Sequence, residues 1–271
     1  MSCESSQEKA FVDMRLLFNA SNEAVLIGLS GDVIGDRMYS TGIYSAKLDK
    51  ELNMLSETES NFSEEVLNGV NNIREREARM SERRRRRRER RQERKSDEQQ
   101  EEMRIAKMAA LNINTIEFAQ IDEQGDAVLI LEEQYVRVVE TTTRNANGTT
   151  TTTRTYYYHY EDLILAKVMG DTIVQNFYNK YYVLANLPLA KSLEASLTNG
   201  EMTIISQENI LRVNQDLSNV KAYDFESIES EGGRSSRRNI FLYRKTLNDN
   251  VIMALARKGK KFQWFRYEIR D

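Results

Sequence analysis

Short apolar runs recur along this chain, and each is followed by a basic residue, a polar turn and a second run in which apolar and polar residues alternate. Such pairs of runs lie at 42–49 with 52–55, 163–168 with 173–177, 209–213 with 220–223, and 251–257 with 262–265. Alternating runs of about four to eight residues separated by polar turns are typical of β-hairpins. The pattern therefore predicts a mainly β protein with four such hairpins.

The four hairpins share a spacing as well as a pattern. Their basic residues are Lys47, Lys167, Arg212 and Arg257, and the intervals from 167 to 212 and from 212 to 257 are 45 residues each. Further strand candidates precede the hairpins at 24–27, 127–131, 202–205 and 239–243. This arrangement predicts a β-propeller-like repeat of four-stranded or three-stranded blades, complete or partial. The alternative is that four hairpins resemble one another by chance.

A highly charged segment at about 63–111 interrupts this pattern. It opens with Ser63, a favourable N-cap, followed by two glutamates in the first helical turn. Ten Lys or Arg residues lie between positions 83 and 95, no apolar residue occurs from 82 to 102, and the segment contains no proline. These features predict one long, charged α-helical insertion whose middle is fully solvated.

Another region, residues 134–160, is rich in threonine and tyrosine. Both residue types favour strands on half-exposed surfaces. The region contains Asn147-Gly148, and Asn-Gly is the strongest short signal for a type I′ hairpin turn. The sequence predicts a protruding β-hairpin in which a two-residue turn sets Val136 opposite His159.

These patterns divide the chain into three parts. The first β repeat occupies residues 1–62, the charged helical insertion occupies 63–111, and the remaining β repeats occupy 112–271 with the long hairpin at 134–160. At 271 residues, 40% of them hydrophobic, the chain is long enough for one large or two small domains.

One part of the chain carries a recognisable motif. The run Glu-Glu-Gln-Tyr at 132–135, the threonine-rich Asn-Gly turn, and the run Tyr-Tyr-Tyr-His-Tyr-Glu-Asp-Leu-Ile at 156–164 resemble a group of uncharacterised β-propeller-like proteins common in Bacteroidetes. The resemblance is close over about 121–177. In the rest of the chain it is limited to the general pattern of apolar runs and polar turns. It brings no catalytic residue with it, and it implies an extracytoplasmic or cell-envelope setting.

Few residues point to catalysis or to a metal site. The chain has one histidine, His159, and one cysteine, Cys3, so neither a zinc site nor a Cys–His or Ser–His–Asp arrangement is indicated. The carboxylate pairs at 132–133 and 161–162 are adjacent on strands and should point to opposite faces, which argues against a paired acid–base site. We therefore expect no enzyme activity, no cofactor and no metal site.

A glycine-rich stretch at 28–35 follows a strand candidate. It contains neither G-x-G-x-x-G nor a terminal Lys-Ser/Thr pair, so it lacks the pattern of a nucleotide-binding loop. We expect a hairpin loop at this position.

The sequence shows no targeting or membrane-spanning signal. No run of about 18 apolar residues occurs, and residues 1–10 are polar, without the apolar region of a signal peptide. The residues themselves indicate neither a location nor an oligomeric state.

The favoured hypothesis is a non-catalytic, β-propeller-like binding or scaffold protein that recognises a macromolecular partner, expected to be a protein, through its hairpin and charged helix. Tyrosine offers a large contact area with a polar tip. Because strand side chains alternate, about half of the tyrosines should instead pack on the body. The residues expected to contact the partner are Tyr156, Tyr157, Tyr158, Tyr160, Arg144 and Arg154.

The alternative hypothesis is binding of nucleic acid or an anionic surface through the arginine-rich helix. Clustered cations attract phosphates by releasing counterions. Acidic residues flank the cluster and no aromatic residue interleaves it, so a solvated spacer is an equally good interpretation. The residues expected to bind anions are Arg83, Arg84, Arg85, Arg86, Arg87, Arg88, Arg90 and Arg91.

Overall fold

The computed structural model of this chain describes residues 10–19, 23–34, 37–69, 113, 115–145, 147–180, 182–189, 191–207, 209–224, 240–248, 251–258 and 261–268. The fold is mainly β, as predicted, and its sheets are antiparallel. The chain forms two compact units. Unit 1 comprises Met1–Glu133 and Asp162–Lys180, and unit 2 comprises Gln134–Glu161 and Tyr181–Asp271.

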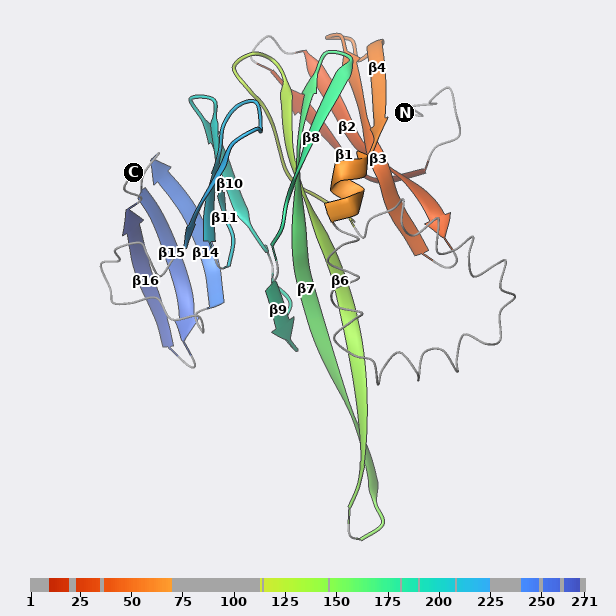
Figure 1. The fold of residues 1–271 in the computed structure, drawn as a ribbon, viewed down its shortest axis with the longest axis vertical. Coiled ribbons are helices and arrows are strands. Elements are labelled where there is room, and N and C mark those ends of the chain that lie inside the picture. The colour runs from red at the N-terminus through yellow and green to blue at the C-terminus, as the bar shows by residue number, and fades with distance from the viewer. Residues whose placement is uncertain are drawn as a thin grey trace. The chain divides into compact units, whose positions relative to one another are not determined.

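Unit 1 contains two sheets of consecutive antiparallel strands (Figure 1). Sheet A has the order β1 (Ala10–Phe18), β2 (Ala24–Ile34), β3 (Arg37–Leu48) and β4 (Met54–Asn61). Sheet B has the order β5 (Ile116–Ile121), β6 (Ala127–Arg144), β7 (Thr150–Met169) and β8 (Thr172–Tyr178). The long strands β6 and β7 run from unit 1 into unit 2.

The core of unit 1 forms between sheets A and B because alternate residues on their inner strands are apolar. Ile27 and Leu29 of β2, Leu129 and Leu131 of β6, and Ile164 of β7 are fully buried in this one core. Burying a side chain of this size contributes about 1.5–3 kcal/mol to folding. Face-to-face packing of the two sheets therefore holds unit 1 together.

Polar side chains join sheet A to sheet B at both margins of this core. Asp13 of β1 accepts a hydrogen bond from the backbone N–H of Ile116 in β5 (2.9 Å). Gln175 of β8 accepts from the backbone N–H of Ser63 (3.0 Å) and donates to the carbonyl of Asn61 (3.0 Å). These directional bonds fix how one sheet is placed on the other.

A helix begins directly after sheet A. The hydroxyl oxygen of Ser63 accepts the backbone N–H of Val66 (3.3 Å), so the predicted N-cap is confirmed. Residues 64–69 are helical, and Val66 is buried in the core of unit 1. Of the long charged helix predicted at 63–111, only this first part falls within the described residues, which resume at 113.

The glycine-rich stretch belongs to a strand rather than to the expected loop. Gly28 and Gly31 both lie within β2. A Cβ atom on Gly31 would stand 2.6 Å from the carbonyl oxygen of Tyr39 and 2.7 Å from the side chain of Val12. Glycine is required here because neighbouring strands approach too closely for a larger residue.

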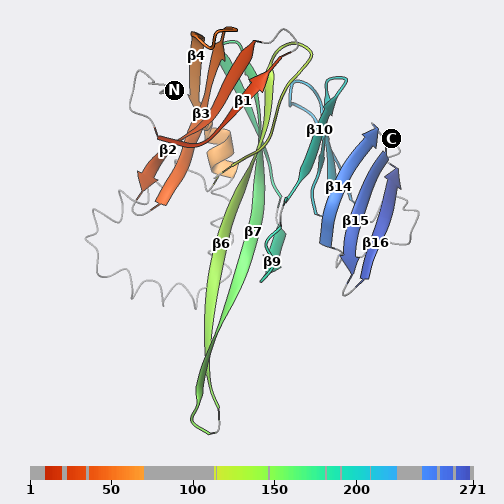
Figure 2. The same ribbon diagram turned by 180° about the vertical axis from the view of Figure 1, so that it is seen from behind.

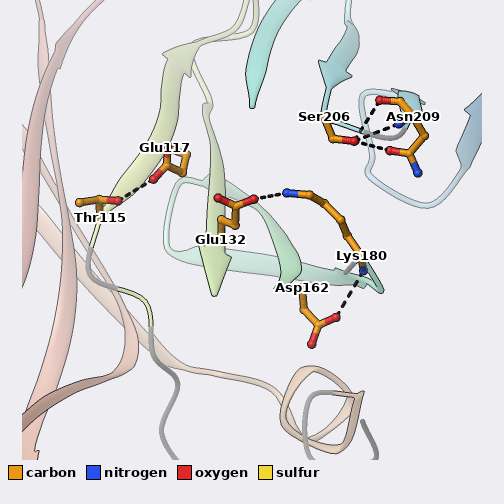
Figure 3. Close-up of polar contacts among 7 residues, drawn as sticks. All are labelled: Thr115, Glu117, Glu132, Asp162, Lys180, Ser206 and Asn209. Carbon is orange, nitrogen blue, oxygen red and sulfur yellow. Dashed lines mark hydrogen bonds and ion pairs between the residues drawn. The ribbon is translucent and has the colours of Figure 1, made fainter. Parts of the chain in front are cut away.

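A buried ion pair links β6 to the segment that follows β8 (Figure 3). The Nζ atom of Lys180 contacts Oε1 of Glu132, and both side chains are almost fully buried. Asp162 of β7 accepts hydrogen bonds from the side chain of Asn179 (3.2 Å) and from the backbone N–H of Lys180 (3.4 Å). Each of these buried carboxylates therefore has the donor that burial of a charge requires.

A second buried cation, Lys167 of β7, contacts the turn between β5 and β6. Its Nζ lies 2.8 Å from Oδ2 of Asp122 and 3.4 Å from Oδ2 of Asp126. Burial acts to raise the pKa of Asp122, but hydrogen bonds from Lys167 and from two backbone N–H groups outweigh it and lower the pKa. Burial also acts to lower the pKa of Lys167, and the two carboxylates outweigh it and raise the pKa.

Unit 2 contains two further antiparallel sheets, together with the short strand β9 (Tyr182–Ala185). Sheet C has the order β10 (Glu194–Thr198), β11 (Glu201–Ile205), β12 (Asn209–Val213) and β13 (Val220–Asp224). Sheet D has the order β14 (Ile240–Asn248), β15 (Val251–Lys258) and β16 (Lys261–Glu268). Their shared core includes Ile205, Ile210, Ile252, Phe265 and Tyr267.

The aligned basic residues occupy comparable places in their strands but different surroundings. Each lies among the last three residues of its strand: Lys47 in β3, Lys167 in β7, Arg212 in β12 and Arg257 in β15. Lys47 is exposed, whereas Lys167 and Arg212 are buried. The shared sequence position therefore reflects the end of a strand and does not create one repeated environment.

All four predicted hairpins are confirmed, as β3–β4, β7–β8, β12–β13 and β15–β16. A closed propeller is not observed, because the strands of the described residues form no ring of sheets. A propeller blade packs on two neighbours, whereas the core identified in each unit joins two sheets. The predicted first repeat at 1–62 contains sheet A, and the strands beyond 112 are divided between the two units.

Replacing Lys167 with methionine should lower the free energy of unfolding of unit 1 by about 3–5 kcal/mol, because Asp122 becomes a buried carboxylate without its cation. Chemical denaturation followed by circular dichroism measures the change. Lys47→Met is the matched control, since Lys47 is exposed near the end of β3, and it should change the value by at most about 0.5 kcal/mol. Equal effects of the two substitutions would contradict the role assigned to the buried pair.

The same pair predicts a pH dependence of the free energy of unfolding. The pKa of Asp122 is lowered in the folded state, so its stabilisation is present above the unfolded pKa of about 3.9 and is lost as the pH falls through the folded pKa. The pKa of Lys167 is raised, so its stabilisation is present below about 10.4 and is lost as the pH rises through the folded pKa. The difference between the parent protein and Lys167→Met should be largest between these limits. A difference that stays constant from acid to alkaline pH would show that the pair does not titrate in this way.

Candidate functional site

The parts of β6 and β7 that belong to unit 2, residues 134–161, form a two-stranded hairpin that we call the arm (Figure 1). The turn is closed by hydrogen bonds from the N–H of Asn145 to the carbonyl of Thr149 and from the N–H of Gly148 to the carbonyl of Asn145, both 2.9 Å. Gly148 has a φ of 83°, in the left-handed region. The turn therefore spans three residues and ends in a left-handed glycine, whereas the sequence predicted a two-residue turn at Asn147-Gly148.

The longer turn shifts the register of the arm by one residue from the prediction. The rings of Tyr135 and His159 are stacked with their centroids 4.3 Å apart, whereas the prediction placed Val136 opposite His159. Nearer the turn, the Nε of Arg154 donates to Glu140 (2.6 Å). A change of one residue in the register gives every side chain of a hairpin a different cross-strand neighbour.

One face of the arm carries exposed apolar side chains. The exposed fractions are 50% for Val136, 48% for Val138 and 40% for Tyr156. The two valines share a face because strand side chains alternate, and the observed register places Tyr156 opposite Val138. Exposed apolar side chains gathered in this way mark an interaction surface, whereas scattered ones do not.

The backbone edges of the arm are open beyond its root. β5 pairs with β6 only as far as Leu131, and β9 pairs with β7 only from Tyr157 to Tyr160. Asn186, which follows β9, makes the last contacts: its N–H donates to the carbonyl of Tyr156 (2.6 Å), and its side chain accepts the N–H of Tyr156 (3.0 Å). In the part of the chain that the structure describes, no other strand lies beside the outer half of the arm.

Three side chains form a cluster at the root of the arm. The phenol of Tyr135 donates to Oε1 of Glu161 (2.8 Å), and the same oxygen lies 3.2 Å from Nδ1 of His159. Burial, together with the charge of Arg137, lowers the pKa of His159. The imidazole is therefore neutral at pH 7, and with its proton on Nδ1 it donates to the carboxylate. The cluster connects β6 to β7 at the point where the arm begins.

The predicted contact tyrosines occupy three different environments. Tyr156 is exposed, Tyr157 and Tyr158 are half-buried, and Tyr160 is buried. The hydroxyl oxygen of Tyr160 accepts the backbone N–H of Leu189 (2.7 Å). Tyr160 therefore packs within unit 2 and does not form part of an exposed surface, because its strand is covered by β9 at this level.

The two predicted arginines of the arm, Arg144 and Arg154, are exposed. Arg154 is paired with Glu140, and this hydrogen bond raises the pKa of Arg154. The predicted anion-binding residues Arg83, Arg84, Arg85, Arg86, Arg87, Arg88, Arg90 and Arg91 lie outside the described residues.

The sequence analysis missed Val136 and Val138 as surface residues, and it missed Tyr135 and Glu161 as partners of His159. Period-two alternation could have placed the two valines on one face. The ring stacking and the shared carboxylate could not be inferred, because they depend on the register and hence on the length of the turn.

Comparisons with protein-family models, with curated proteins and with solved structures returned no match. The resemblance to β-propeller-like proteins therefore stays a prediction. Within the described ranges, no helix has the length and apolar character needed to cross a membrane. Within the same ranges, no three His, Cys, Asp or Glu side chains are grouped so that they could hold a metal ion.

The single histidine of the chain allows a direct test of the arm root. His159 should titrate below its ordinary pKa of about 6.5, because burial disfavours the imidazolium form. As the pH is lowered, the imidazole of the unfolded chain binds its proton at a higher pH than that of the folded chain. The free energy of unfolding should therefore fall as the pH drops through about 6.5 towards the folded pKa. NMR of the imidazole resonance gives the midpoint, and His159→Phe, which keeps an aromatic ring over Tyr135, should remove this part of the pH dependence. A midpoint at or above 6.5 would contradict the burial argument.

Proposed function

We propose that this chain is a non-catalytic, β-rich binding protein that recognises a protein partner through the arm, with its small packed sheets serving as the scaffold. One observation carries the proposal: Val136, Val138 and Tyr156 lie exposed on one face of a ribbon whose two backbone edges are open within the described residues. An open strand edge with apolar side chains beside it is a template for pairing with another chain.

The chemistry of the arm favours an extended protein segment as the partner. Open backbone N–H and C=O groups can hydrogen-bond an added strand, and alternate side chains can supply specificity, as in β-strand addition. Threonines fill much of the outer arm, and one of its charged pairs, Glu140 with Arg154, is satisfied internally. The nearest charges on the face of Val138 therefore neutralise one another, which suits an apolar peptide strand better than a phosphate backbone.

The buried polar groups support a binding role without catalysis. Lys167 is held by Asp122, and Lys180 is held by Glu132. At the arm root, Glu161 accepts the hydrogen bond of a tyrosine. Each of these carboxylates forms an ion pair or a hydrogen bond with a neighbouring side chain, which is a structural role.

A second candidate function follows from the arginine-rich stretch, whose ten cations between positions 83 and 95 would attract phosphates. Replacing all six residues from Arg83 to Arg88 with glutamine should then reduce retention on heparin and make it less sensitive to salt. If the parent protein is not retained on heparin or duplex DNA at low salt, this second function is excluded.

Photo-crosslinking tests the arm directly. A photoreactive amino acid at position 138, introduced into the protein in its native cells, should form an adduct with a protein partner. Thr141 is exposed on the same strand, and alternation places it on the opposite face, so the same probe at position 141 is the matched control. Equal yields at both positions, or no adduct at 138, would show that this face is not the contact surface.

Shortening the arm should abolish the adduct without unfolding the protein. Replacing residues 138–156 with Asn-Gly joins Arg137 to Tyr157, which are opposite one another in the observed register, and it keeps the buried root. The removed side chains are mostly exposed, so the thermal midpoint should change by no more than about 2 °C. A much larger fall would mean that the outer arm is part of the folded core.

A further inference from the structure

Sheet D has an outer face that combines exposed aromatic rings with cations, and it is separate from the arm. Phe265 and Tyr267 of β16 are buried in the core shared with sheet C. Phe262 and Trp264 alternate with them, so they belong to the opposite face, and their exposed fractions are 62% and 54%. In Figure 2 β16 forms the outer edge of this three-stranded sheet, beyond β15.

Cations lie on the same sheet as the two rings. Lys245 on β14 is exposed. Lys261 at the start of β16 is also exposed, but alternation places it on the face of Phe265 and Tyr267. The register places Lys245 beside Met253, and Met253 beside Arg266, so all three occupy one row across the sheet. Positions 240–268 contain seven Lys or Arg against two Asp or Glu, although the whole chain has a net charge of −3. The segment is thus cationic on an acidic protein, and on its outer face Arg266 lies 3.9 Å from the carboxylate of Glu268.

The spacing of the rings matches a stacking platform. Two residues apart on one strand, the Cα atoms of Phe262 and Trp264 are about 7 Å apart. Each ring can therefore take a separate base on its face, and cations beside the rings can neutralise the phosphates between the bases. Exposed aromatics on an antiparallel sheet stack unpaired bases in this manner, and the faces of paired bases in a duplex are not accessible.

We propose that the outer face of sheet D binds single-stranded nucleic acid, with Phe262 and Trp264 stacking successive bases and with Lys245 and Arg266 contacting phosphates. The inference does not depend on the function proposed for the arm, and it uses none of the arginines from 83 to 91. Charge favours this class of partner, because positions 240–268 carry five more cations than acids and an oligonucleotide supplies phosphates that match this excess.

Intrinsic tryptophan fluorescence reports on this site, because Trp264 is the single tryptophan of the chain. Titration of the full chain with a twelve-nucleotide oligouridylate or oligothymidylate at about 50 mM salt should quench tryptophan emission saturably, because a stacked base contacts the indole. A duplex of the same length should quench much less. The affinity should fall as salt is raised, as phosphate contacts require.

Three variants separate this surface from the rest of the chain. Phe262→Leu should weaken oligonucleotide binding by about tenfold, because one stacking partner is lost. Phe18→Leu is the matched control, since Phe18 is similarly exposed (59%) on β1 and has Ala24 as its register partner. It should bind as the parent does. Glutamine at Lys245 and Arg266 together should weaken binding and reduce its salt dependence.

Several outcomes would overturn the proposal. The first is the absence of quenching at oligonucleotide concentrations up to about 100 μM. The second is binding that Phe262→Leu leaves unchanged and that glutamine in place of Arg83 to Arg88 abolishes, which would assign it to the arginine-rich stretch. The third is tighter binding to anionic phosphatidylserine vesicles, with a blue shift of emission, which would identify a lipid surface instead. Phe262→Leu is expected to fold because Phe262 is exposed, and an unchanged circular dichroism spectrum verifies this.

Discussion

A sheet of three or four short strands has two faces and too few residues to bury both, and this constraint governs the whole chain. Sheet A shields one face of sheet B, and sheet C shields one face of sheet D. Apolar contact is non-directional, so it holds sheets together without fixing their stagger. The bonds of Asp13 and Gln175 at the margins of the unit 1 core supply that direction.

Buried charges add to this specification within unit 1. Lys167 with Asp122 and Lys180 with Glu132 link strands that hydrophobic packing alone would allow to slide. Buried ion pairs contribute little net stability compared with apolar residues of the same volume, but a mismatched arrangement leaves a charge unpaired at high cost. Their value here is that they permit one register of β5, β6 and β7, from which the arm continues.

Much of the fold could be predicted from the sequence because period-two alternation is a local property. The hairpin at 209–213 with 220–223 and the cap at Ser63 needed no distant information. The arm register could not be predicted, because Asn147-Gly148 is compatible with two turn lengths, and choosing between them decides which residue faces His159. The strand at Gly31 was misread as a loop, because glycine is needed there for a close approach to β1 and β3 that no local pattern encodes. The aromatic face of sheet D was equally hidden: the run at 262–265 predicts a strand but does not say which side is covered.

The continuity of β6 and β7 gives the molecule a mechanical property. A load applied at Gly148 would travel along both strands into sheet B, where β5 and β8 flank them in antiparallel pairing. Their hydrogen bonds run perpendicular to the strands, so such a load would strain many of them together in shear and would not open them one at a time. A tether attached at the tip would thus be resisted by these hydrogen bonds collectively.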